Sequence, residues 1–364
     1  MRLALAEARR ALGRVSPNPA VGAVVVREGQ AVARGRTQPP PGPHAEVVAL
    51  ARAGELARGA TLYVTLEPCA HHGRTPPCTE AILRAGVAEV HMAMLDPDPR
   101  VCGRGKETLE RAGVAVRLGE GEAEARRLLE AYVKHRTTGR PFVIAKFAAS
   151  LDGRIAAASG DSRWVSGPQA REWAHRLRAQ VDAIAVGSGT VLADDPHLTA
   201  RPGGRLARRQ PLRVLLDSRG RIPLTARALD GAAPTLVVTG EASAREWRAA
   251  LVARGVEVLV LPQDGGHVEL DALLSELGRR GVLSLLVEGG GELLGAFFDL
   301  RLVDKVHAVI APLVIGARGA RAAVEGRGAS VMAEALRLRH VSVRRLGDDI
   351  LVTGYTALEK EGGR

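Results

Sequence analysis

Two series of alternating strand and helix patterns, separated by a break at Gly139-Arg140-Pro141, constrain the fold of this chain most strongly. At about 150 residues per domain, a chain of 364 residues is long enough for two domains. Strands that alternate with helices are typical of α/β domains. We therefore expect two α/β domains, over residues 1–140 and 141–364.

The first series opens with two strands joined by a turn at Glu28-Gly29 and closes with an amphipathic helix. Its strands are expected over residues 20–26, 30–35, 60–68, 87–95 and 114–118. Its helices are expected over residues 44–55, 79–86, 106–113 and 122–138. This order predicts one sheet with helices packed against it.

The second series begins after the break, and it shows no internal repeat. Its strands are expected over residues 142–150, 183–189, 212–218, 235–240, 256–262 and 283–291, and near 305–315, 341–346 and 350–358. Its helices are expected over residues 167–180, 242–254 and 269–280. A basic loop rich in Gly and Pro, residues 201–211, separates two of the strands.

The net charge and the aromatic content of the chain limit the classes of ligand that it is expected to bind. The net charge of +11 favours anionic ligands such as nucleic acid, phosphorylated metabolites or nucleotide cofactors. An Arg-rich composition bias is the alternative explanation for this charge. Aromatic residues make up only 3% of the chain, which argues against a single-stranded nucleic-acid platform built on base stacking.

Cysteine content and hydropathy bear on the compartment. Three cysteines are too few for a disulfide framework, so a reducing, cytoplasmic location is expected. The apolar run at the N-terminus is interrupted by Glu7, too early for the core of a signal peptide. No uncharged stretch is long enough to span a membrane.

His44, Cys69 and Cys78 form the strongest chemical signature, within PHAE (43–46) and EPCAHHGRTPPC (67–78). One imidazole and two thiolates are ligands that Zn²⁺ prefers. Three protein ligands leave a fourth tetrahedral position for water, as in catalytic sites, where zinc makes that water acidic. We expect one Zn²⁺ per chain, with His71 and His72 as alternative ligands and Cys102 outside the site.

Glu46 lies two residues after His44, in the first turn of the same predicted helix. A carboxyl group there can take a proton from the water and pass it to a leaving amine. The pattern H-x-E followed by P-C-x-x-C marks zinc deaminases. Here eight residues rather than two separate the cysteines.

The second half carries a weaker signal of its own. VEGGGELLGAFF (287–298) predicts a buried strand, a glycine turn and a helix, an arrangement that binds phosphates at the helix N-terminus. VGSGTVLADDP (186–196) is a second strand exit with glycines. Neither is a G-x-G-x-x-G fingerprint, and either is also explained as a simple turn.

Several segments resemble the bifunctional deaminase–reductase family of riboflavin biosynthesis. In the first half these are SPNPAVGAVVV (16–26), PHAE, TLEPCAHHGRTPPC and DPDPRVCGRG. In the second half they are AKFAASLDGRIAAASGDSRWVSG (145–167), residues 176–201, LLDS (215–218) and VEGGGELLGAFF. The resemblance implies a cytidine-deaminase-like α/β/α zinc domain followed by a dihydrofolate-reductase-like domain that uses NADPH.

The resemblance also implies roles for individual residues. Asn18 is expected to face the deaminase substrate. Contacts to the nicotinamide nucleotide are expected from Ala148, Trp164, Thr190, Asp194, Ser218, Gly290, Gly291, Glu292, Leu293, Leu294, Gly295 and Ala296. Contacts to the sugar-phosphate substrate are expected from Ser162, Arg178, Leu198, Arg201 and Glu288. Apart from the resemblance, the place of Lys146 on the first strand of the second half predicts that it donates a hydrogen bond or a proton near the reacting carbon, the alternative being a structural pair with a carboxylate.

These implications predict a cytoplasmic enzyme with two activities. The first half would remove the 2-amino group of 2,5-diamino-6-ribosylamino-4(3H)-pyrimidinone 5′-phosphate, and the second would reduce the ribosyl chain with NADPH. The partners expected are this phosphorylated pyrimidine and further copies of the chain, without nucleic acid or membrane. The alternatives are a nucleic-acid deaminase with an accessory binding domain, favoured by the charge, and a zinc-stabilised scaffold without activity.

Overall fold

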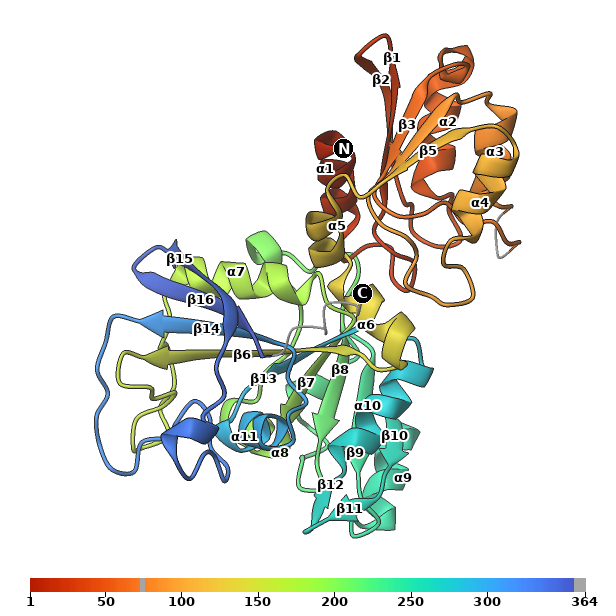
Figure 1. Cartoon of the computed structure of the whole chain (residues 1–364). Coiled ribbons are helices and arrows are strands. Elements are labelled where there is room, and N and C mark those ends of the chain that lie inside the picture. Colours follow the sequence, from red (N-terminus) through yellow and green to blue (C-terminus); the bar gives the residue numbers. More distant parts are fainter. Residues whose placement is uncertain (73–75, 357–364) are drawn as a thin grey trace. The chain divides into compact units, whose positions relative to one another are not determined.

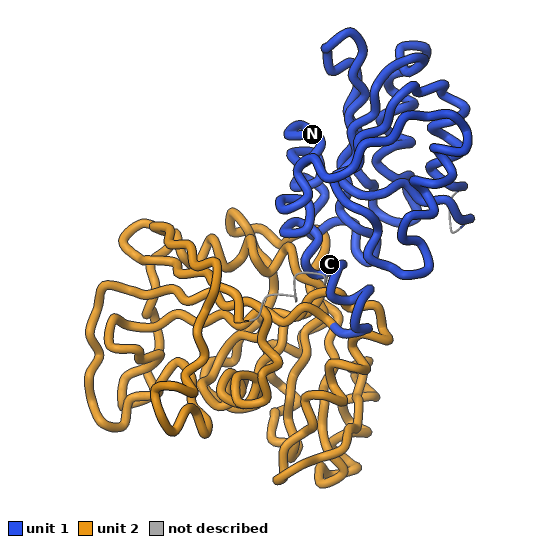
Figure 2. Tube along the Cα trace, in the orientation of Figure 1, with its two compact units in different colours: residues 1–140 blue, residues 141–364 orange. Residues whose placement is uncertain are grey.

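The computed structural model describes residues 1–72 and 76–356 (Figure 1). The chain divides into two compact units, Met1–Arg140 and Pro141–Arg364 (Figure 2). Each unit combines one main sheet with helices, so the predicted α/β fold class is confirmed. Within the described residues, no helix combines the length and apolarity needed to cross a membrane.

Unit 1 is built on a five-stranded mixed sheet. The strand order is β2 (Gln30–Arg36), β1 (Gly22–Arg27), β3 (Thr61–Val64), β4 (Glu89–Met92), β5 (Ala115–Leu118). β1 is antiparallel to β2 and β3, whereas β3, β4 and β5 are parallel. The helices are α1 (Arg2–Ala11), α2 (Ala45–Ala53), α3 (Cys78–Arg84), α4 (Arg104–Arg111), α5 (Glu122–Leu128) and α6 (Glu130–Thr138).

Two glycines allow helices to approach both faces of this sheet. A Cβ on Gly22 would lie 2.0 Å from the carbonyl oxygen of Ala4 in α1, and a Cβ on Gly35 would lie 2.2 Å from that of Ala45 in α2. Gly35 is the register partner of Ala23, so Gly22 and Gly35 point to opposite faces. α1 and α2 therefore cover opposite faces, which gives the expected three layers.

Unit 2 is built on a nine-stranded sheet. The strand order is β10 (Glu257–Val260), β9 (Thr235–Thr239), β8 (Leu212–Leu216), β7 (Ala183–Gly187), β13 (Ser284–Glu288), β6 (Phe142–Ser150), β14 (Lys305–Ala311), β16 (Asp349–Tyr355), β15 (Arg339–Leu346). In this order, all strands from β10 at the edge to β14 run parallel to one another, whereas β16 and β15 are each antiparallel to the preceding strand. The helices are α7 (Pro168–Arg178), α8 (Ser188–Asp194), α9 (Arg245–Ala253), α10 (Leu270–Arg279) and α11 (Gly291–Asp299).

The buried run of β13 explains its central position. All five of its side chains are buried, as expected of a parallel strand covered on both faces. β13 lies between β7 and β6, although about a hundred residues separate it from β7 in sequence. Ligands of such sheets bind beyond the carboxyl ends of the strands, where the strand order reverses. The ends of β6, β7, β8 and β13 meet at this edge.

Several strands, such as β3 and β13, are shorter than expected, and four elements differ from expectation in kind. The single helix expected over residues 122–138 is wrong, because the backbone of Leu129 (φ −103°, ψ 14°) separates α5 from α6. α1, α8 and the short hairpin of β11 (Gln263–Asp264) and β12 (His267–Val268) had not been predicted.

Candidate active sites

His44, Cys69 and Cys78 come together at the ends of three elements of unit 1. His44 directly precedes α2, Cys69 follows β3 in a loop, and Cys78 is the first residue of α3. Their ligand atoms all lie within 4.8 Å of one another. The structure therefore places the three predicted zinc ligands in one cluster.

The spacing of these atoms fits zinc. His44 Nδ1 lies 3.3 Å from Cys78 Sγ and 3.7 Å from Cys69 Sγ. Zn–N and Zn–S bonds of about 2.0 and 2.3 Å in a tetrahedron put nitrogen and sulfur about 3.5 Å apart. Three such donors can hold a zinc ion with little movement and leave a fourth position open.

The thiols of Cys69 and Cys78 differ in the direction in which their pKa values are shifted. Hydrogen bonds from the Cys78 thiol and, more weakly, from its backbone N–H lower the pKa of Cys69 to about 4. The Cys78 amide nitrogen lies 3.4 Å from Cys69 Sγ. The same thiol–thiol hydrogen bond, together with burial, raises the pKa of Cys78. The pair therefore holds one thiolate readily, and a thiolate is the form that binds a metal ion.

Glu46 lies in the first turn of α2 beside this cluster and is 3% exposed. Burial and the neighbouring Cys69 raise the pKa of Glu46 to about 7. A buried carboxyl group with a pKa near neutrality can both accept and release a proton, which is the property of a general acid–base. Burial thus gives the expected proton carrier a suitable environment.

Glu67 is a buried residue whose role the sequence interpretation missed. Its carboxylate accepts backbone hydrogen bonds, 2.8–3.1 Å long, from Asp96, Gly103, Gly105 and Lys106. Glu67 precedes Cys69 by two residues, so it joins the metal-ligand loop to residues 96–106. The only sequence signal was its place in the EPC motif.

Other residues considered for this site are less closely tied to it. Asn18 is half-buried in the loop between α1 and β1, and among the described residues no hydrogen bond joins its side chain to the three ligands. His71 and His72 are exposed and are not part of the ligand cluster. Cys102 is also exposed and outside the cluster.

A cavity of about 1050 Å³ lies at the carboxyl edge of the sheet in unit 2. Its volume is at the upper end of the about 300–1,000 Å³ typical of small-molecule sites, which leaves room for two ligands. Eleven of the predicted residues line this cavity. They are Lys146, Ala148, Ser162, Thr190, Asp194, Ser218, Glu288, Gly290, Glu292, Leu293 and Ala296.

Lys146 and Glu288 are an oppositely charged pair that lines the cavity. They are register partners on β6 and β13, and Lys146 Nζ lies 4.0 Å from Glu288 Oε1. Arg178 Nη2 lies 2.5 Å from Glu288 Oε2. Burial lowers the pKa of Lys146. Burial opposes ionisation of Glu288 too, but the charges of Arg178 and Lys146 outweigh it and lower the pKa of Glu288.

The glycine turn after β13 is held against α8. Thr190 Oγ1 accepts a hydrogen bond from the Gly290 N–H at 2.9 Å. Gly289 has φ +104°, and a Cβ there would lie 2.6 Å from Thr190 Oγ1, so only glycine fits. Ser162 Oγ donates to Asp194 Oδ1 at 3.0 Å. The turn thus places the N-terminus of α11 at the cavity.

Seven predicted residues do not line the cavity: Trp164, Arg178, Leu198, Arg201, Gly291, Leu294 and Gly295. Leu294 is fully buried in the core, and Trp164 is 68% exposed beneath the guanidinium of Arg171. Gly291 and Gly295 face the segment 322–326, where a Cβ on Gly295 would overlap Glu325. Ligand contacts for these residues stay predictions.

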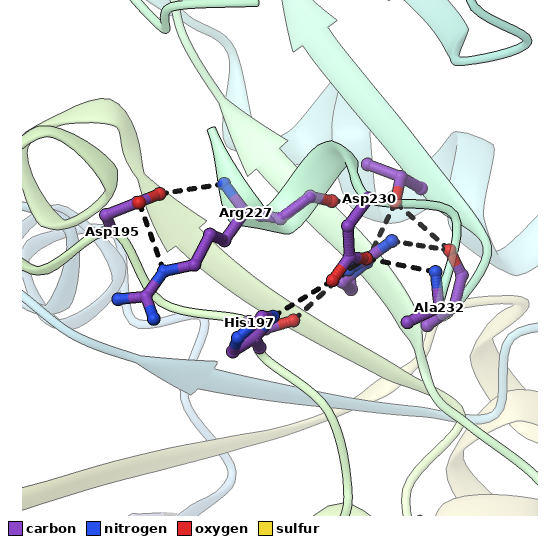
Figure 3. Close-up of polar contacts among 9 residues, drawn as sticks. Asp195, His197, Arg227, Asp230 and Ala232 are labelled. Atoms are coloured by element: carbon purple, nitrogen blue, oxygen red, sulfur yellow. Dashed lines mark hydrogen bonds and ion pairs between the residues drawn. The ribbon is translucent and has the colours of Figure 1, made fainter. Parts of the chain in front are cut away.

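A polar network around buried Arg213 supports the segment that contains Leu198 (Figure 3). Arg213 is fully buried, and its Nη1 donates to Asp230 Oδ1 at 2.8 Å and to the carbonyl oxygen of His197 at 3.2 Å. The His197 ring and Asp230 are 2.9 Å apart, and Arg227 pairs with Asp195 at 3.1 Å. The segment 195–198 is therefore fixed to residues 227–230.

Family models match both units. Residues 1–94 match the cytidine and deoxycytidylate deaminase zinc-binding region, and residues 141–352 match the RibD C-terminal domain. A riboflavin biosynthesis protein RibD of Aquifex aeolicus is 41% identical over 355 residues, covering 97% of this chain and 96% of that protein. This chain belongs to the RibD family. Its Escherichia coli relative is also 41% identical, with 96% of both chains covered.

Solved structures of the RibD family share the whole fold. Acinetobacter baumannii RibD, form 1, superposes with a TM-score of 0.88 at 39% identity, covering 98% of both chains. A Thermotoga maritima protein gives a TM-score of 0.86 at 35% identity, covering 98% of this chain and 97% of that one. That protein is named a diaminohydroxyphosphoribosylaminopyrimidine deaminase/5-amino-6-(5-phosphoribosylamino)uracil reductase.

Proposed function

We propose that this chain catalyses two successive steps of riboflavin biosynthesis. Unit 1 removes the 2-amino group of 2,5-diamino-6-ribosylamino-4(3H)-pyrimidinone 5′-phosphate by hydrolysis. Unit 2 then reduces the ribosyl side chain with NADPH, which gives 5-amino-6-ribitylamino-uracil 5′-phosphate. The observation that carries this proposal is the cluster of His44, Cys69 and Cys78 beside buried Glu46, in a chain that also holds the Lys146–Glu288 cavity.

In the deamination, His44, Cys69 and Cys78 would hold a zinc ion, which would supply an activated water as nucleophile. The carboxylate of Glu46 would accept a proton from the nucleophile and donate it to the departing amino group, which leaves as ammonia. Its pKa of about 7 suits both transfers near neutral pH. The pyrimidine is expected to reach Asn18 from the loop before β1, and the hydrogen bonds of Glu67 keep residues 96–106 against the metal-ligand loop.

In the reduction, the dinucleotide supplies the hydride. The donor groups fit such a ligand, because the Gly289-Gly290 turn and the N-terminus of α11 open into the cavity and can bind its phosphates. Arg178 and Arg201 are proposed to bind the substrate phosphate. Lys146 and Glu288 hold opposite charges beside the reacting carbon, and Lys146 is the proposed donor of a proton or hydrogen bond there.

Two alternatives are less well supported. The RibD C-terminal domain match over residues 141–352 favours the reductase over an accessory nucleic-acid-binding domain. A non-catalytic zinc scaffold does not account for Glu46, which is buried beside the metal cluster. A cytoplasmic location is consistent with three free cysteines, and assembly into a homo-oligomer stays a prediction.

The proposal is tested by identifying the product formed without NADPH. The purified chain is incubated with the diaminopyrimidine ribotide, and zinc, ammonia and product mass are determined. We expect about one zinc per chain and a product in which oxygen replaces one amino nitrogen. Release of ammonia from cytidine or from oligonucleotides, but not from the ribotide, would refute the proposal in favour of the nucleic-acid alternative.

A further inference from the structure

The two arginines that are proposed to bind the substrate phosphate come from different elements. Arg178 is the last residue of α7, and Arg201 lies in the segment between α8 and β8. Glu288 orients the guanidinium of Arg178, whose Nε and Nη2 lie 3.2 and 2.5 Å from Glu288 Oε2. Within the part of the chain that the structure describes, the guanidinium of Arg201 has no ion pair, so its charge is available to a ligand. One phosphate can bind both arginines only if the backbone of Arg201 is fixed relative to α7.

His175 of α7 provides this connection. His175 Nδ1 accepts the backbone N–H of Arg201 at 3.2 Å. His175 precedes Arg178 by three residues, so the two side chains lie on one face of the helix. Arg178 Nη1 donates to the carbonyl oxygen of Thr199 at 3.4 Å. Two successive turns of α7 therefore bind the backbone on either side of residue 200. The sequence interpretation had not singled out His175.

The hydrogen bond to Arg201 requires one protonation state of His175. A backbone N–H can only donate, so Nδ1 must carry no proton and the proton of the neutral ring lies on Nε2. Burial and the charges of Arg178 and Arg201 lower the pKa of His175 from its ordinary value of 6.5. The neutral ring therefore predominates at neutral pH. Protonation would place a hydrogen on Nδ1, break the hydrogen bond and add a third positive charge.

The other charged groups around His175 do not change their charge near neutral pH. They are Glu172, Arg176 and Arg178 on α7, Arg201 in the bound segment and Glu288 on β13. The Gly203 N–H and Arg176 lower the pKa of Glu172. The pKa of Glu288 is also lowered, as described above, so both carboxyl groups stay ionised. His175 is therefore the group of this set whose charge changes first when the pH falls below neutrality.

We propose that His175 is a positioning residue of the reductase, which holds Arg201 beside Arg178 so that the two guanidinium groups bind the substrate phosphate together. Arginine binds phosphate through parallel hydrogen bonds, and small displacements weaken such a site strongly. The phosphate takes no part in hydride transfer, so we expect its binding to change KM rather than kcat. The inference rests on the proposed reductase function and on its assignment of both arginines.

The test compares His175→Ala and His175→Asn with the control Arg176→Ala. The amide oxygen of asparagine can accept the Arg201 N–H in place of Nδ1, but it does not titrate. Arg176 is the next residue of α7, and its side chain is 68% exposed and pairs with Glu172. KM and kcat are measured for NADPH-dependent reduction of the deaminated intermediate. Calorimetry without NADPH gives the affinity for this intermediate and for its dephosphorylated form, and the KM of NADPH verifies that unit 2 is folded.

We expect His175→Ala to raise the KM of the deaminated intermediate at least about tenfold and to change kcat and the KM of NADPH less than about twofold. His175→Asn should recover most of the loss, and Arg176→Ala should behave as the wild type. The calorimetric affinity should fall in His175→Ala for the phosphorylated intermediate and stay unchanged for the dephosphorylated form. An unchanged KM in His175→Ala, or an equal loss of affinity for both forms, would overturn the inference.

The pH dependence of KM separates positioning from a purely structural role. The wild-type KM should rise as the pH falls below 6.5, because the protonated ring cannot accept the Arg201 N–H. His175→Asn should lack this rise and keep only the part caused by protonation of the substrate phosphate, whose second pKa is about 6. Identical profiles for the two proteins would also overturn the inference. A wild type that binds the intermediate without oxidising NADPH would refute the proposed reductase alone, whereas failure to bind the intermediate would refute both.

Discussion

Glu67 Oε1 accepts a hydrogen bond from the Gly105 N–H at 2.8 Å, at a point where the two backbones touch. A Cβ on Gly105 would lie 2.0 Å from the carbonyl oxygen of Pro68, which neighbours Cys69. Any larger residue at position 105 must therefore push the start of α4 away from the metal-ligand loop.

Gly105→Ala should destabilise unit 1 and weaken its hold on zinc. Overpacking of this kind costs about 1–3 kcal/mol, which thermal unfolding monitored with a zinc chelator can measure. Gly113→Ala shows the cost of backbone strain without a clash, because Gly113 has φ +84° and nothing would lie within 4 Å of its Cβ. Wild-type stability and zinc retention in Gly105→Ala would contradict the close approach.

Glu46→Gln should abolish deamination and leave the metal site intact. The amide cannot transfer the proton, and general acid–base groups contribute about 10²–10⁴-fold. We expect ammonia release to fall by at least about 100-fold, with zinc content and NADPH-dependent reduction of the deaminated intermediate unchanged. A variant that keeps zinc and still deaminates at the wild-type rate would rule out Glu46 as the proton carrier.

Removal of zinc should abolish the deaminase activity and leave the reductase activity unchanged. Cys78 is completely buried and Cys69 has its pKa lowered to about 4, so the cluster provides a strong thiolate donor. Cys78→Ala, or prolonged chelation, should eliminate ammonia release and leave the reductase rate unchanged. Cys102→Ala, which alters the exposed cysteine outside the cluster, should have no effect on zinc content. Equal zinc loss in both variants would speak against the assigned ligands.

Asp230→Asn should destabilise unit 2 in a pH-dependent way. Arg213 has no exposed surface but Asp230 is 30% exposed, so removing the charge that pairs with Arg213 should cost less than the about 3–5 kcal/mol of a fully buried pair. Burial opposes ionisation of Asp230, but its hydrogen bonds, led by that from Arg213, lower its pKa to about 2. Ionised Asp230 therefore contributes stability above its ordinary pKa of 3.8, and the contribution is lost as the pH falls toward 2.

The measurement is urea unfolding of the wild type and Asp230→Asn at several pH values. The difference in unfolding free energy should be constant near neutral pH and should shrink as the pH falls from about 4 toward 2. Arg213→Met in the Asp230→Asn background should recover part of the loss, because it removes the unpaired buried charge. A difference between the two proteins that does not change with pH would contradict a stabilising role for the charge of Asp230.

Local patterns were sufficient to predict most of the fold. Hydrophobic alternation located the main strands of both units, and the combination of His44, Cys69 and Cys78 identified the ligand cluster because metal chemistry restricts residue types sharply. α1 was missed although Ala4, Leu5, Ala8 and Ala11 follow a helical period and are buried. At the start of a chain, the same apolar residues are also compatible with an export signal.

Contacts between strands or residues that are distant in sequence could not be predicted from the sequence. The insertion of β13 between β7 and β6 depends on tertiary contacts, and Glu67, Asp217 and Arg213 act through backbone groups or partners distant in sequence. The ligand contacts that the resemblance implies stay predictions. Thr190 and Ser218 line the cavity, whereas Leu294 lies in the core.

The central claim is that one chain performs deamination first and reduction second. The direct test follows ammonia release and NADPH oxidation together on the diaminopyrimidine ribotide, with wild type and Glu46→Gln. We expect ammonia to appear before NADPH is consumed, no NADPH oxidation by Glu46→Gln, and its recovery when the deaminated intermediate is supplied. NADPH oxidation by Glu46→Gln on the original ribotide, without ammonia release, would contradict the proposed order.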